Sequence, residues 1–235
     1  MNILITGASR GIGGAAYALL KSGGHNVAGH STRGSDELIP GDLAEPSAPC
    51  RIWEAALGRL DGRIDVLFNN AGIYEGIGDY ASDEDWHAAW ERTLTINLQA
   101  AADLCRYAVG HFREREVEVG RIINIASRAA FRGDSPQHWH YAASKAGMIG
   151  MTKSIARGYA AQGILAFAVA PGFTVSEMTE EYLSGRGGAQ IVADIPLGRV
   201  ATTDEVAEVI RWLAVDAPAS ATGSVIDVNG ASYVR

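Results

Sequence analysis

The sequence predicts an α/β protein, built on a doubly wound parallel sheet of about seven strands in the order 3-2-1-4-5-6-7, with helices on both faces. Two observations predict this class. Short apolar segments rich in β-branched residues alternate with longer helical segments along the whole chain. The short segments are also continuously apolar, which is typical of parallel strands covered by helices on both faces. No repeat or linker divides the chain, so we expect a single domain over residues 1–235.

The expected strands are the short apolar segments, beginning with Ile-Leu-Ile in the first of them. They are Asn2–Thr6, Asn26–His30, Leu38–Gly41, Ile64–Asn69, Gly120–Ala126, Leu165–Ala170 and Ser224–Val228. The expected helices are the longer segments between them: Gly11–Ser22, Pro46–Leu60, Asp83–Glu114, Trp139–Gln162 and Thr203–Val215. Only seven residues separate His30 from Leu38, fewer than the dozen or so that a helical crossover needs. We therefore expect the helix between the second and third strands to be shortened or absent.

Composition excludes several classes of protein. The 235 residues are 47% hydrophobic and 20% charged, which is too apolar for a disordered chain. The net charge of −7 argues against nucleic-acid binding, which needs a basic surface. No apolar run reaches the length of about 18 residues that a membrane span requires, and an apolar strand opens the chain without a basic leader. These features predict a cytoplasmic protein without a membrane span.

The chain contains 28 glycines, and the most informative lie in Thr6-Gly-Ala-Ser-Arg-Gly-Ile-Gly13, which follows a strand and opens a helix. In this context the backbone N–H groups and the helix N-terminus bind the pyrophosphate of a dinucleotide. Gly7 permits the tight turn, Gly11 lets the backbone approach the phosphates, and Gly13 lets the helix pack on the strand. The alternative is a glycine-rich turn without a ligand.

A second motif, Tyr141-Ala-Ala-Ser-Lys145, lies on an expected helix. Positions i and i+4 share a helix face, so the Lys145 ammonium can lie near the Tyr141 hydroxyl. A nearby positive charge lowers the pKa of a tyrosine from about 10 toward the working pH. Tyr141 would then act as a general acid toward a ketone oxygen, or as a base toward an alcohol in the reverse direction. Taken alone, the tyrosine could instead be a half-buried packing residue.

The spacing G-x-x-x-G-x-G resembles that of the short-chain dehydrogenase/reductase family, and further motifs occur in that family's order. They are Asp42-Leu43, Asn69-Asn-Ala-Gly72, Thr95-Ile-Asn-Leu98, Ser127, Tyr141-Ala-Ala-Ser-Lys145, Pro171-Gly172, Ser176 and Val228-Asn-Gly230. The resemblance runs from Asn2 nearly to Arg235. Within the family, the sequence is similar to the 3-oxoacyl-carrier-protein reductase-like branch. It implies one NAD(P)-binding Rossmann domain over residues 1–235.

The resemblance implies a catalytic set of Asn97, Ser127, Tyr141 and Lys145. Ser127 would donate a hydrogen bond to the same substrate oxygen as Tyr141. Lys145 would also hold the nicotinamide ribose, and Asn97 would fix a water that links Lys145 to solvent. Each of these residues alone could have a purely structural role. Ser135 is a rival for the serine role, but it lies in a proline-containing loop, so we favour Ser127.

The resemblance also implies the residues that bind the cofactor. They are Gly7, Ser9, Arg10, Gly11, Ile12, Gly13, Ser31, Thr32, Arg33, Asp42, Leu43, Asn70, Ala71, Gly72, Tyr141, Lys145, Pro171, Gly172, Thr174 and Ser176. Within this set, Asp42 and Leu43 would contact the adenine, and Ser176 would lie near the nicotinamide amide.

The end of the second strand indicates which nicotinamide cofactor is used. His30-Ser-Thr-Arg33 lacks the carboxylate that binds a ribose diol and repels a 2′-phosphate. Arg10 and Arg33 could clamp that phosphate, aided by the hydroxyls of the intervening Ser and Thr. We therefore expect NADP(H) to be favoured over NAD(H). The alternative is that both arginines are solvated surface groups.

We expect the substrate pocket to include His138, Trp139, Phe173 and Met178. The segment Asp134-Ser-Pro-Gln-His-Trp-His140 places two imidazoles and an indole just before Tyr141, although it could instead be a surface loop. The two histidines have no further ligands clustered with them, so no metal site is expected. The segment 174–195 contains Ser184-Gly-Arg-Gly-Gly188, and we expect it to be a mobile lid over the substrate.

The sequence therefore predicts an NADP-preferring oxidoreductase that interconverts a small-molecule carbonyl and its secondary alcohol by hydride transfer. Two alternatives stay open: a 3-oxoacyl-carrier-protein reductase and a non-catalytic NADP(H)-binding regulator. The net charge of −7, with Glu118 and Gln162 where carrier-protein reductases have basic residues, disfavours an acidic carrier protein. In the family, the helices Asp83–Glu114 and Trp139–Gln162 form a dimer interface, and the last strand completes a tetramer. We expect a homodimer or homotetramer.

Overall fold

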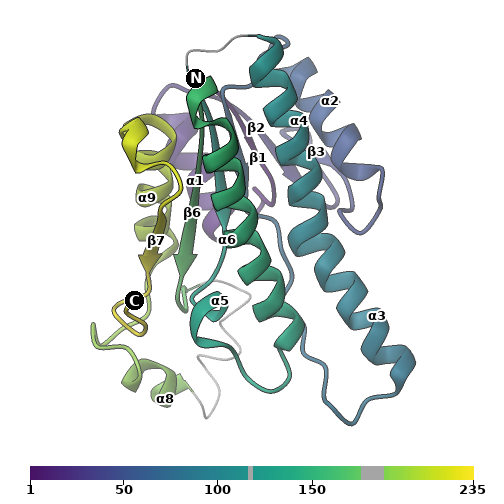
Figure 1. The fold of residues 1–235 in the computed structure, drawn as a ribbon, viewed down its shortest axis with the longest axis vertical. Coiled ribbons are helices and arrows are strands. Elements are labelled where there is room, and N and C mark those ends of the chain that lie inside the picture. Colours follow the sequence, from purple (N-terminus) through teal and green to yellow (C-terminus); the bar gives the residue numbers. More distant parts are fainter. Residues whose placement is uncertain (116–118, 176–187) are drawn as a thin grey trace.

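The computed structural model describes residues 1–115, 119–175 and 188–235. In this part of the chain seven parallel strands form one sheet in the predicted order, β3-β2-β1-β4-β5-β6-β7 (Figure 1). The strands are β1 (Asn2–Ile5), β2 (Asn26–Ser31), β3 (Leu38–Pro40), β4 (Val66–Asn69), β5 (Gly120–Ile125), β6 (Ile164–Pro171) and β7 (Val225–Val228). The strand order reverses between β1 and β4, which pair directly at Ile3–Val66 and Ile5–Phe68.

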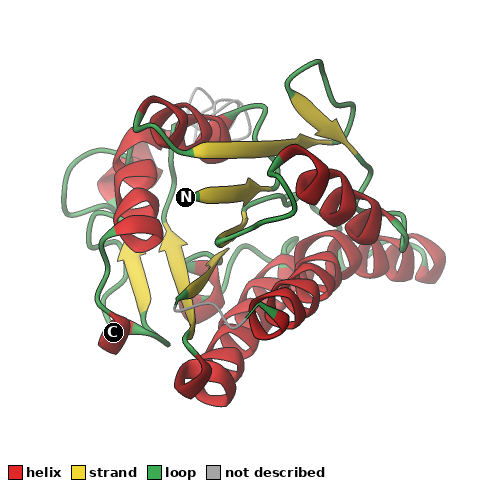
Figure 2. Ribbon diagram, turned by 90° about the horizontal axis from the view of Figure 1, so that it is seen from above, coloured by secondary structure: helices red, strands yellow, loops and turns green. Residues whose placement is uncertain are grey.

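The helices cover both faces of this sheet (Figure 2). They are α1 (Gly11–Ser22), α2 (Ala48–Arg59), α3 (Asp83–Leu94), α4 (Ala100–Glu114), α5 (Ala129–Arg132), α6 (Trp139–Tyr159), α8 (Gly188–Ala193) and α9 (Thr203–Val215). As predicted, residues 32–37 between β2 and β3 contain no helix, and β3 is a three-residue edge strand. No helix in the described ranges is long and apolar enough to cross a membrane.

The predicted helix Asp83–Glu114 is not uniform. Thr95–Gln99 forms a π-helical turn between α3 and α4. One extra residue in a helical turn leaves the apolar periodicity on either side nearly unchanged, so the pattern did not reveal it. Asn97 lies in this turn, and its amide bonds the backbone of Ile73 outside the helix, which accompanies the local widening.

Other boundaries differ at helix ends. The helix expected from Pro46 begins at Ala48, with Pro49 in its first turn, where the missing proline N–H costs no helical hydrogen bond. The helix expected to end at Gln162 is α-helical only to Tyr159 and then tightens into a 3₁₀ turn before Gly163, whose φ is 75°. The short helices α5 and α8, of four and six residues, were not predicted because they are too short to show periodicity.

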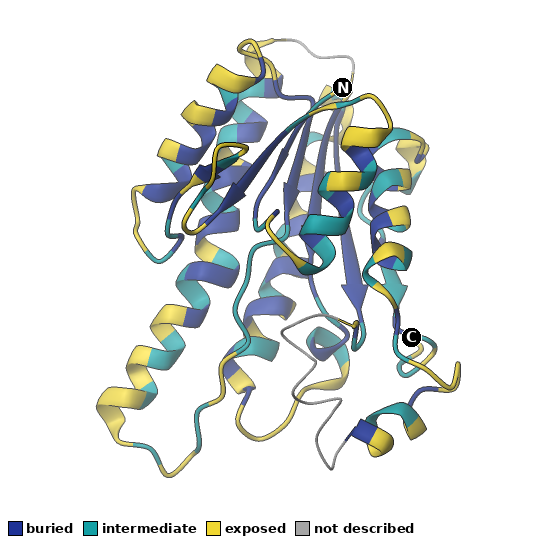
Figure 3. Cartoon of the chain, turned by 180° about the vertical axis from the view of Figure 1, so that it is seen from behind, coloured by how far each residue is buried: buried dark blue, intermediate teal, exposed yellow. Residues whose placement is uncertain are grey.

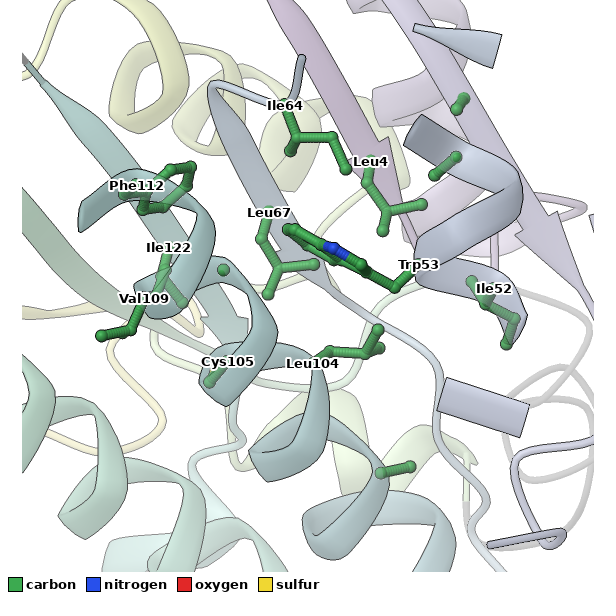
Figure 4. Close-up of a cluster of buried hydrophobic side chains, with 14 of the residues drawn as sticks. Leu4, Ile52, Trp53, Ile64, Leu67, Leu104, Cys105, Val109, Phe112 and Ile122 are labelled. Atoms are coloured by element: carbon green, nitrogen blue, oxygen red, sulfur yellow. The ribbon is translucent and has the colours of Figure 1, made fainter. Parts of the chain in front are cut away.

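Alternating strand residues divide the core into two layers. Leu4, Leu67 and Ile122 face the side covered by α2 and α4, where they pack with residues such as Trp53 and Leu104 (Figure 4). Their strand neighbours Ile3, Ile5, Val66, Phe68, Ile123 and Ile125 face α1 and α9. The strands are buried while the outer helix faces stay exposed (Figure 3). The sheet is thus a rigid platform, and loops at its carboxyl edge are free to carry chemistry.

A buried chain of side-chain hydrogen bonds joins two strands to α6. The Asn69 amide on β4 donates to Asn124 Oδ1 on β5 at 2.9 Å. The Asn124 amide donates to Thr152 Oγ1 at 2.9 Å, and that hydroxyl donates to the Met148 carbonyl at 2.8 Å. Because all of these groups are buried, this chain of hydrogen bonds fixes the position of α6 along the strands.

Replacing Asn124 with alanine should lower the free energy of unfolding by about 2–4 kcal/mol, because Asn69 and Thr152 would each keep a buried polar group without its partner. Urea unfolding measures the change. As a control, Asn26→Ala removes an exposed side-chain hydrogen bond to Asn2 and should lower the free energy of unfolding by less than about 0.5 kcal/mol. Equal effects of the two substitutions would contradict this role of the buried chain.

Candidate active site

The glycine-rich turn between β1 and α1 is tightly packed. Gly7 and Gly11 have φ values of 67° and 58°, which glycine adopts without strain. At Gly13 a Cβ atom would lie 2.1 Å from the Gly7 carbonyl oxygen and 2.4 Å from the Asn70 amide nitrogen. Only glycine fits there, so the first turn of α1 sits directly on the end of β1, as predicted.

The turn after β4 is locked to this turn. Thr6 Oγ1 accepts hydrogen bonds from the backbone N–H groups of Asn70 and Ala71, at 3.0 and 3.1 Å. In return, the Asn70 amide donates to the carbonyls of Thr6 and Gly7, at 3.1 and 3.0 Å. Two strand-end loops are therefore joined at the point where the strand order reverses, where doubly wound sheets bind nucleotides.

His30 also supports the glycine-rich turn, and the sequence analysis gave it no role. Its imidazole is buried at the end of β2, with Nδ1 3.4 Å from the Gly7 backbone nitrogen and Nε2 2.8 Å from the Gly41 carbonyl oxygen. Burial lowers the pKa of His30, which favours the neutral ring that accepts at Nδ1 and donates at Nε2. An apolar strand ending in a histidine was the only available signal.

The residues around this turn fit a dinucleotide. The N-cap of α1 is Arg10, which makes no side-chain cap, so the first-turn N–H groups face the carboxyl edge of the sheet without a side-chain acceptor. Arg10, Thr32 and Arg33 are exposed beside the turn, whereas the Ser31 hydroxyl accepts from the Gly34 N–H. A cleft on this side is lined by residues from the turn and the β2–β3 loop: Ala8, Ser9, Arg10, Gly11, Gly14, Ala15, Tyr17, Ser35, Asp36, Glu37, Leu38 and Thr203.

The remaining predicted cofactor residues line the same edge of the sheet. Asp42 follows β3 and accepts from the Ala44 N–H, and Leu43 is buried beside it. Gly172 at the end of β6 donates to the Val228 carbonyl. Thr174 is buried, and its hydroxyl donates to the Gly172 carbonyl at 3.3 Å. Ser176 and Met178, and most of the expected lid, lie outside the described residues.

The structure brings Ser127, Tyr141 and Lys145 together at the ends of β5 and α6. Ser127 lies close enough to the Tyr141 hydroxyl to act on the pKa of that tyrosine, and its Oγ accepts a hydrogen bond from the Ala129 N–H at 3.1 Å. The Lys145 ammonium lies 5.8 Å from the centroid of the Tyr141 ring and donates to the Ile125 carbonyl at 2.9 Å. The one-turn spacing thus places both side chains on one face of α6, as predicted.

The expected depression of the tyrosine pKa is not found in this state. Burial raises the pKa of Tyr141 to about 12, and the hydrogen bond with Ser127 opposes that shift. Burial lowers the pKa of Lys145 to about 8. The physical reason is that the ammonium is engaged by the Ile125 carbonyl, while both groups have lost water.

Asn97 faces Lys145 across Gly72. The Asn97 Oδ1 atom accepts from the Ile73 N–H at 2.8 Å, and its amide donates to the Ile73 carbonyl and to Ser144 Oγ. A Cβ atom at Gly72 would lie 3.1 Å from Asn97 Oδ1 and 3.5 Å from Lys145 Nζ. The π-helical turn therefore carries Asn97 into the same site as the tyrosine and lysine.

The loop before Tyr141 separates the two serine candidates. Ser135 Oγ lies 2.7 Å from His138 Nδ1, whereas Ser127 is the serine that acts on the pKa of Tyr141. The His138 ring stacks on Tyr74, with centroids 3.9 Å apart, and Tyr74 meets the Tyr141 ring edge-on at 4.8 Å. Tyr74 was missed because it lies in an irregular loop, two residues after Gly72.

Two more aromatic residues of this region, Trp139 and His140, begin α6 and pack against tryptophans of α3. Trp139 is 51% exposed and contacts Trp86 edge-on at 5.5 Å, and His140 packs against Trp90. Phe173, at the end of β6, lies under the Arg128 guanidinium at 5.0 Å. Among the side chains that the structure describes, no group of three or more His, Cys, Asp or Glu residues is arranged to hold a metal ion.

The parallel sheet, its glycine-rich turn and the Tyr141–Lys145 pair define an α/β oxidoreductase. A sequence model of the family described as Enoyl-(Acyl carrier protein) reductase matches residues 7–231. Nodulation protein G of Rhizobium meliloti is 36% identical, covering 97% of this chain and 94% of the relative. Acetoacetyl-CoA reductase of Shinella zoogloeoides is 33% identical, covering 98% and 97%. The 3-oxoacyl-(acyl-carrier-protein) reductase of Escherichia coli is 35% identical, covering 98% and 96%.

Solved structures agree with these relatives. A short-chain dehydrogenase from Burkholderia cenocepacia, in complex with NADP, superposes with a TM-score of 0.87 and 26% identity, covering 98% of this chain and 97% of that one. A variant of a Serratia marcescens short-chain dehydrogenase/reductase gives a TM-score of 0.88 at 27% identity, covering 99% and 97%. The chain belongs to the short-chain dehydrogenase/reductase family.

Replacing Gly13 with alanine should lower the free energy of unfolding by about 1–3 kcal/mol, because the new methyl group would overlap the Gly7 carbonyl and the Asn70 amide. Thermal or urea unfolding checks this. Gly14 is the matched control, since a Cβ there would meet only ordinary contacts, the nearest at 3.6 Å. Gly14→Ala should be neutral or stabilise the protein by up to about 1 kcal/mol. Loss of stability in both variants would contradict the close approach at Gly13.

Proposed function

We propose that this protein is an NADP-preferring reductase or dehydrogenase that interconverts a small-molecule carbonyl and its secondary alcohol. The observation that carries the proposal is the contact of Ser127 with Tyr141, beside Lys145, at the carboxyl edge of the sheet. Bound NADP(H) supplies or accepts the hydride at the carbonyl carbon. The residues of this chain bind the carbonyl compound and move the accompanying proton.

In the reductive direction Tyr141 gives its proton to the carbonyl oxygen, and Ser127 donates a hydrogen bond to the same oxygen. The product is the secondary alcohol, and the tyrosinate regains its proton from the Lys145 side of the site. Lys145, with its pKa lowered to about 8 by burial, is suited to pass a proton near neutral pH. Asn97, facing Lys145 across Gly72, can hold the water that connects this lysine to solvent.

The preference for NADP(H) is supported by charge at the end of β2. Arg33 is exposed there, Arg10 lies at the start of α1, and residues 30–33 contain no carboxylate. A dianionic 2′-phosphate would be attracted to such a site, because arginine forms paired hydrogen bonds with phosphate oxygens. The NADP complex of the Burkholderia cenocepacia relative is in accord with this preference.

A free small molecule is favoured over a carrier-bound substrate. The net charge is −7, and the exposed Gln162 offers no positive charge to an acidic carrier protein. The relatives named acetoacetyl-CoA reductase and 3-oxoacyl-(acyl-carrier-protein) reductase keep the carrier-bound 3-oxoacyl substrate as the alternative. Efficient reduction of acetoacetyl carrier protein would favour that alternative.

The proposal includes a homodimer or homotetramer. Gly110 of α4 and Gly150 and Gly158 of α6 have no atoms within 4 Å of an added Cβ, so packing inside the chain does not explain them. Gly147 of α6 differs from these three, because an added Cβ there would lie 2.8 Å from the Leu98 side chain. The two helices run side by side on one face of the sheet, where a second copy could approach closely (Figures 1 and 2).

Replacing Tyr141 with phenylalanine should lower kcat/KM for carbonyl reduction by about 10²–10⁴-fold or more, because the proton donor is lost. The dissociation constant for NADPH should change by less than about threefold. Steady-state kinetics and fluorescence titration measure the two quantities. Tyr80→Phe, at an exposed tyrosine, is the control and should leave both unchanged. A wild type that binds NADPH but reduces no carbonyl in a broad panel would favour a regulatory protein instead.

The wild type should bind NADPH more tightly than NADH, and Arg33→Ala should weaken NADPH binding by about 10–100-fold, since a charged hydrogen bond to the 2′-phosphate is removed. NADH binding should not change in the same variant. Calorimetric titration with both cofactors gives the comparison. Arg157→Ala removes the same charge from the exposed surface of α6 and should affect neither cofactor. Tighter binding of NADH by the wild type would overturn the assignment.

A further inference from the structure

Arg128 directly follows Ser127 in the chain and has no part in the mechanism above. It follows Ser127 directly at the end of β5, and its backbone N–H donates to the Pro171 carbonyl at 3.0 Å. The residue is only 9% exposed. Its guanidinium carbon lies 5.0 Å from the centroid of the Phe173 ring. The side chain is therefore held between the ends of β5 and β6, at the edge of the sheet that carries the site.

The guanidinium has no counter-ion in the part of the chain that the structure describes. Its Nη1 atom is fully enclosed and has no hydrogen-bond partner there. No carboxylate among the described residues lies within 4.0 Å of it, whereas Arg132, one turn later, is paired with Asp194 at 2.7 Å. A desolvated charge without a partner is unfavourable, and arginine cannot relieve this by losing its proton.

The charged groups around Arg128 leave this positive charge uncompensated. Burial is the largest influence lowering the pKa of Arg128, and the Arg132 charge acts in the same direction. Asp194, Asp134 and Tyr74 act in the opposite direction and more weakly. Asp194 is paired with Arg132, and Asp134 accepts from the Tyr74 hydroxyl at 3.1 Å. Among the described residues, no carboxylate is therefore left to pair with Arg128.

The surroundings also place this charge relative to the reacting group. Tyr74 contacts Tyr141 edge-on and also influences Arg128 electrostatically, so the three side chains lie in the same region of the site. Phe173 forms the floor under the guanidinium. A substrate whose carbonyl oxygen meets Ser127 and Tyr141 can extend a substituent toward Arg128, which directly follows Ser127 after the end of β5.

We propose that Arg128 binds a carboxylate of the substrate, so that the substrate class is a small oxo acid, or the corresponding hydroxy acid, with its carboxylate close to the reacting carbon. This inference rests on the proposed function and specifies its substrate. A carboxylate is favoured over a phosphate because one guanidinium without a counter-ion among the described residues matches the single charge of a carboxylate, whereas a phosphate brings a second negative charge. The next arginine is already neutralised, and Asp134 would repel a dianion.

The test compares charged and neutral forms of the same carbonyl compound. Acetoacetate is paired with ethyl acetoacetate, 2-oxobutanoate with its methyl ester, and dihydroxyacetone phosphate with dihydroxyacetone. The kcat/KM of each is measured with NADPH for the wild type, Arg128→Gln, Arg128→Met and the control Arg157→Gln, at an exposed position of α6. Arg128→Met retains the packing on Phe173, and thermal unfolding reports whether each variant is folded.

For the wild type we expect kcat/KM to favour at least one carboxylate over its ester by about tenfold or more. Both Arg128 variants should lose this preference, while turnover of the esters stays within about threefold of the wild type. Arg157→Gln should keep the preference. Equal use of acid and ester by the wild type, or an unchanged ratio in the Arg128 variants, would overturn the inference. A preference for the phosphate alone would overturn the carboxylate assignment.

A binding measurement separates this inference from the proposed function. Calorimetry with acetoacetate and its ester, added to the NADP⁺-loaded protein, reports anion recognition in a complex that cannot react. If the acid binds more tightly than the ester, and the Arg128 variants lose this difference, the inference is supported even when no compound is reduced. The absence of any reduction would overturn only the proposed reductase activity. Turnover of neutral carbonyls without any preference for acids overturns the inference and leaves the reductase standing. If the Arg128 variants lose as much affinity for NADPH as for the acid, the guanidinium belongs to the cofactor site, and the inference is overturned.

Discussion

The rest of the site depends on the close approach of two strand-end turns, those after β1 and β4. No side chain can occupy position 13, because a Cβ there would overlap the Gly7 carbonyl, and Asn70 and Thr6 join the turns by reciprocal hydrogen bonds. The chain connections that follow β1 and β4 lead to opposite sides of the sheet, so a crevice opens between these two strand ends. The first turn of α1 consequently faces the crevice, and Gly72, two residues further on, brings Asn97 and Lys145 close together.

Burial determines the electrostatics of this crevice. Loss of water raises the pKa of Tyr141 to about 12 and lowers the pKa of Lys145 to about 8. Arg128 is desolvated at the same edge of the sheet. The described residues therefore place two buried basic groups at this edge of the sheet.

Much of the fold could be predicted because its signals are local. Continuously apolar segments, separated by helical periodicity, were sufficient for the sheet order, and the short span from His30 to Leu38 for the missing helix. The π-helical turn at Thr95–Gln99 could not be predicted, because one inserted residue barely disturbs the apolar pattern. Helix ends also shifted by two or three residues, as cap chemistry and tertiary contacts compete there.

The sequence by itself determined the family, the glycine-rich turn and the spacing of Tyr141 and Lys145, because each is a short pattern set by backbone geometry. Only the tertiary structure decided which groups meet across strands. It brought Ser127 rather than Ser135 close to the tyrosine, stacked Tyr74 on His138, and enclosed Arg128 with no counter-ion among the described residues. The physical reason is that burial and pairing depend on neighbours distant in the chain, which no local pattern records.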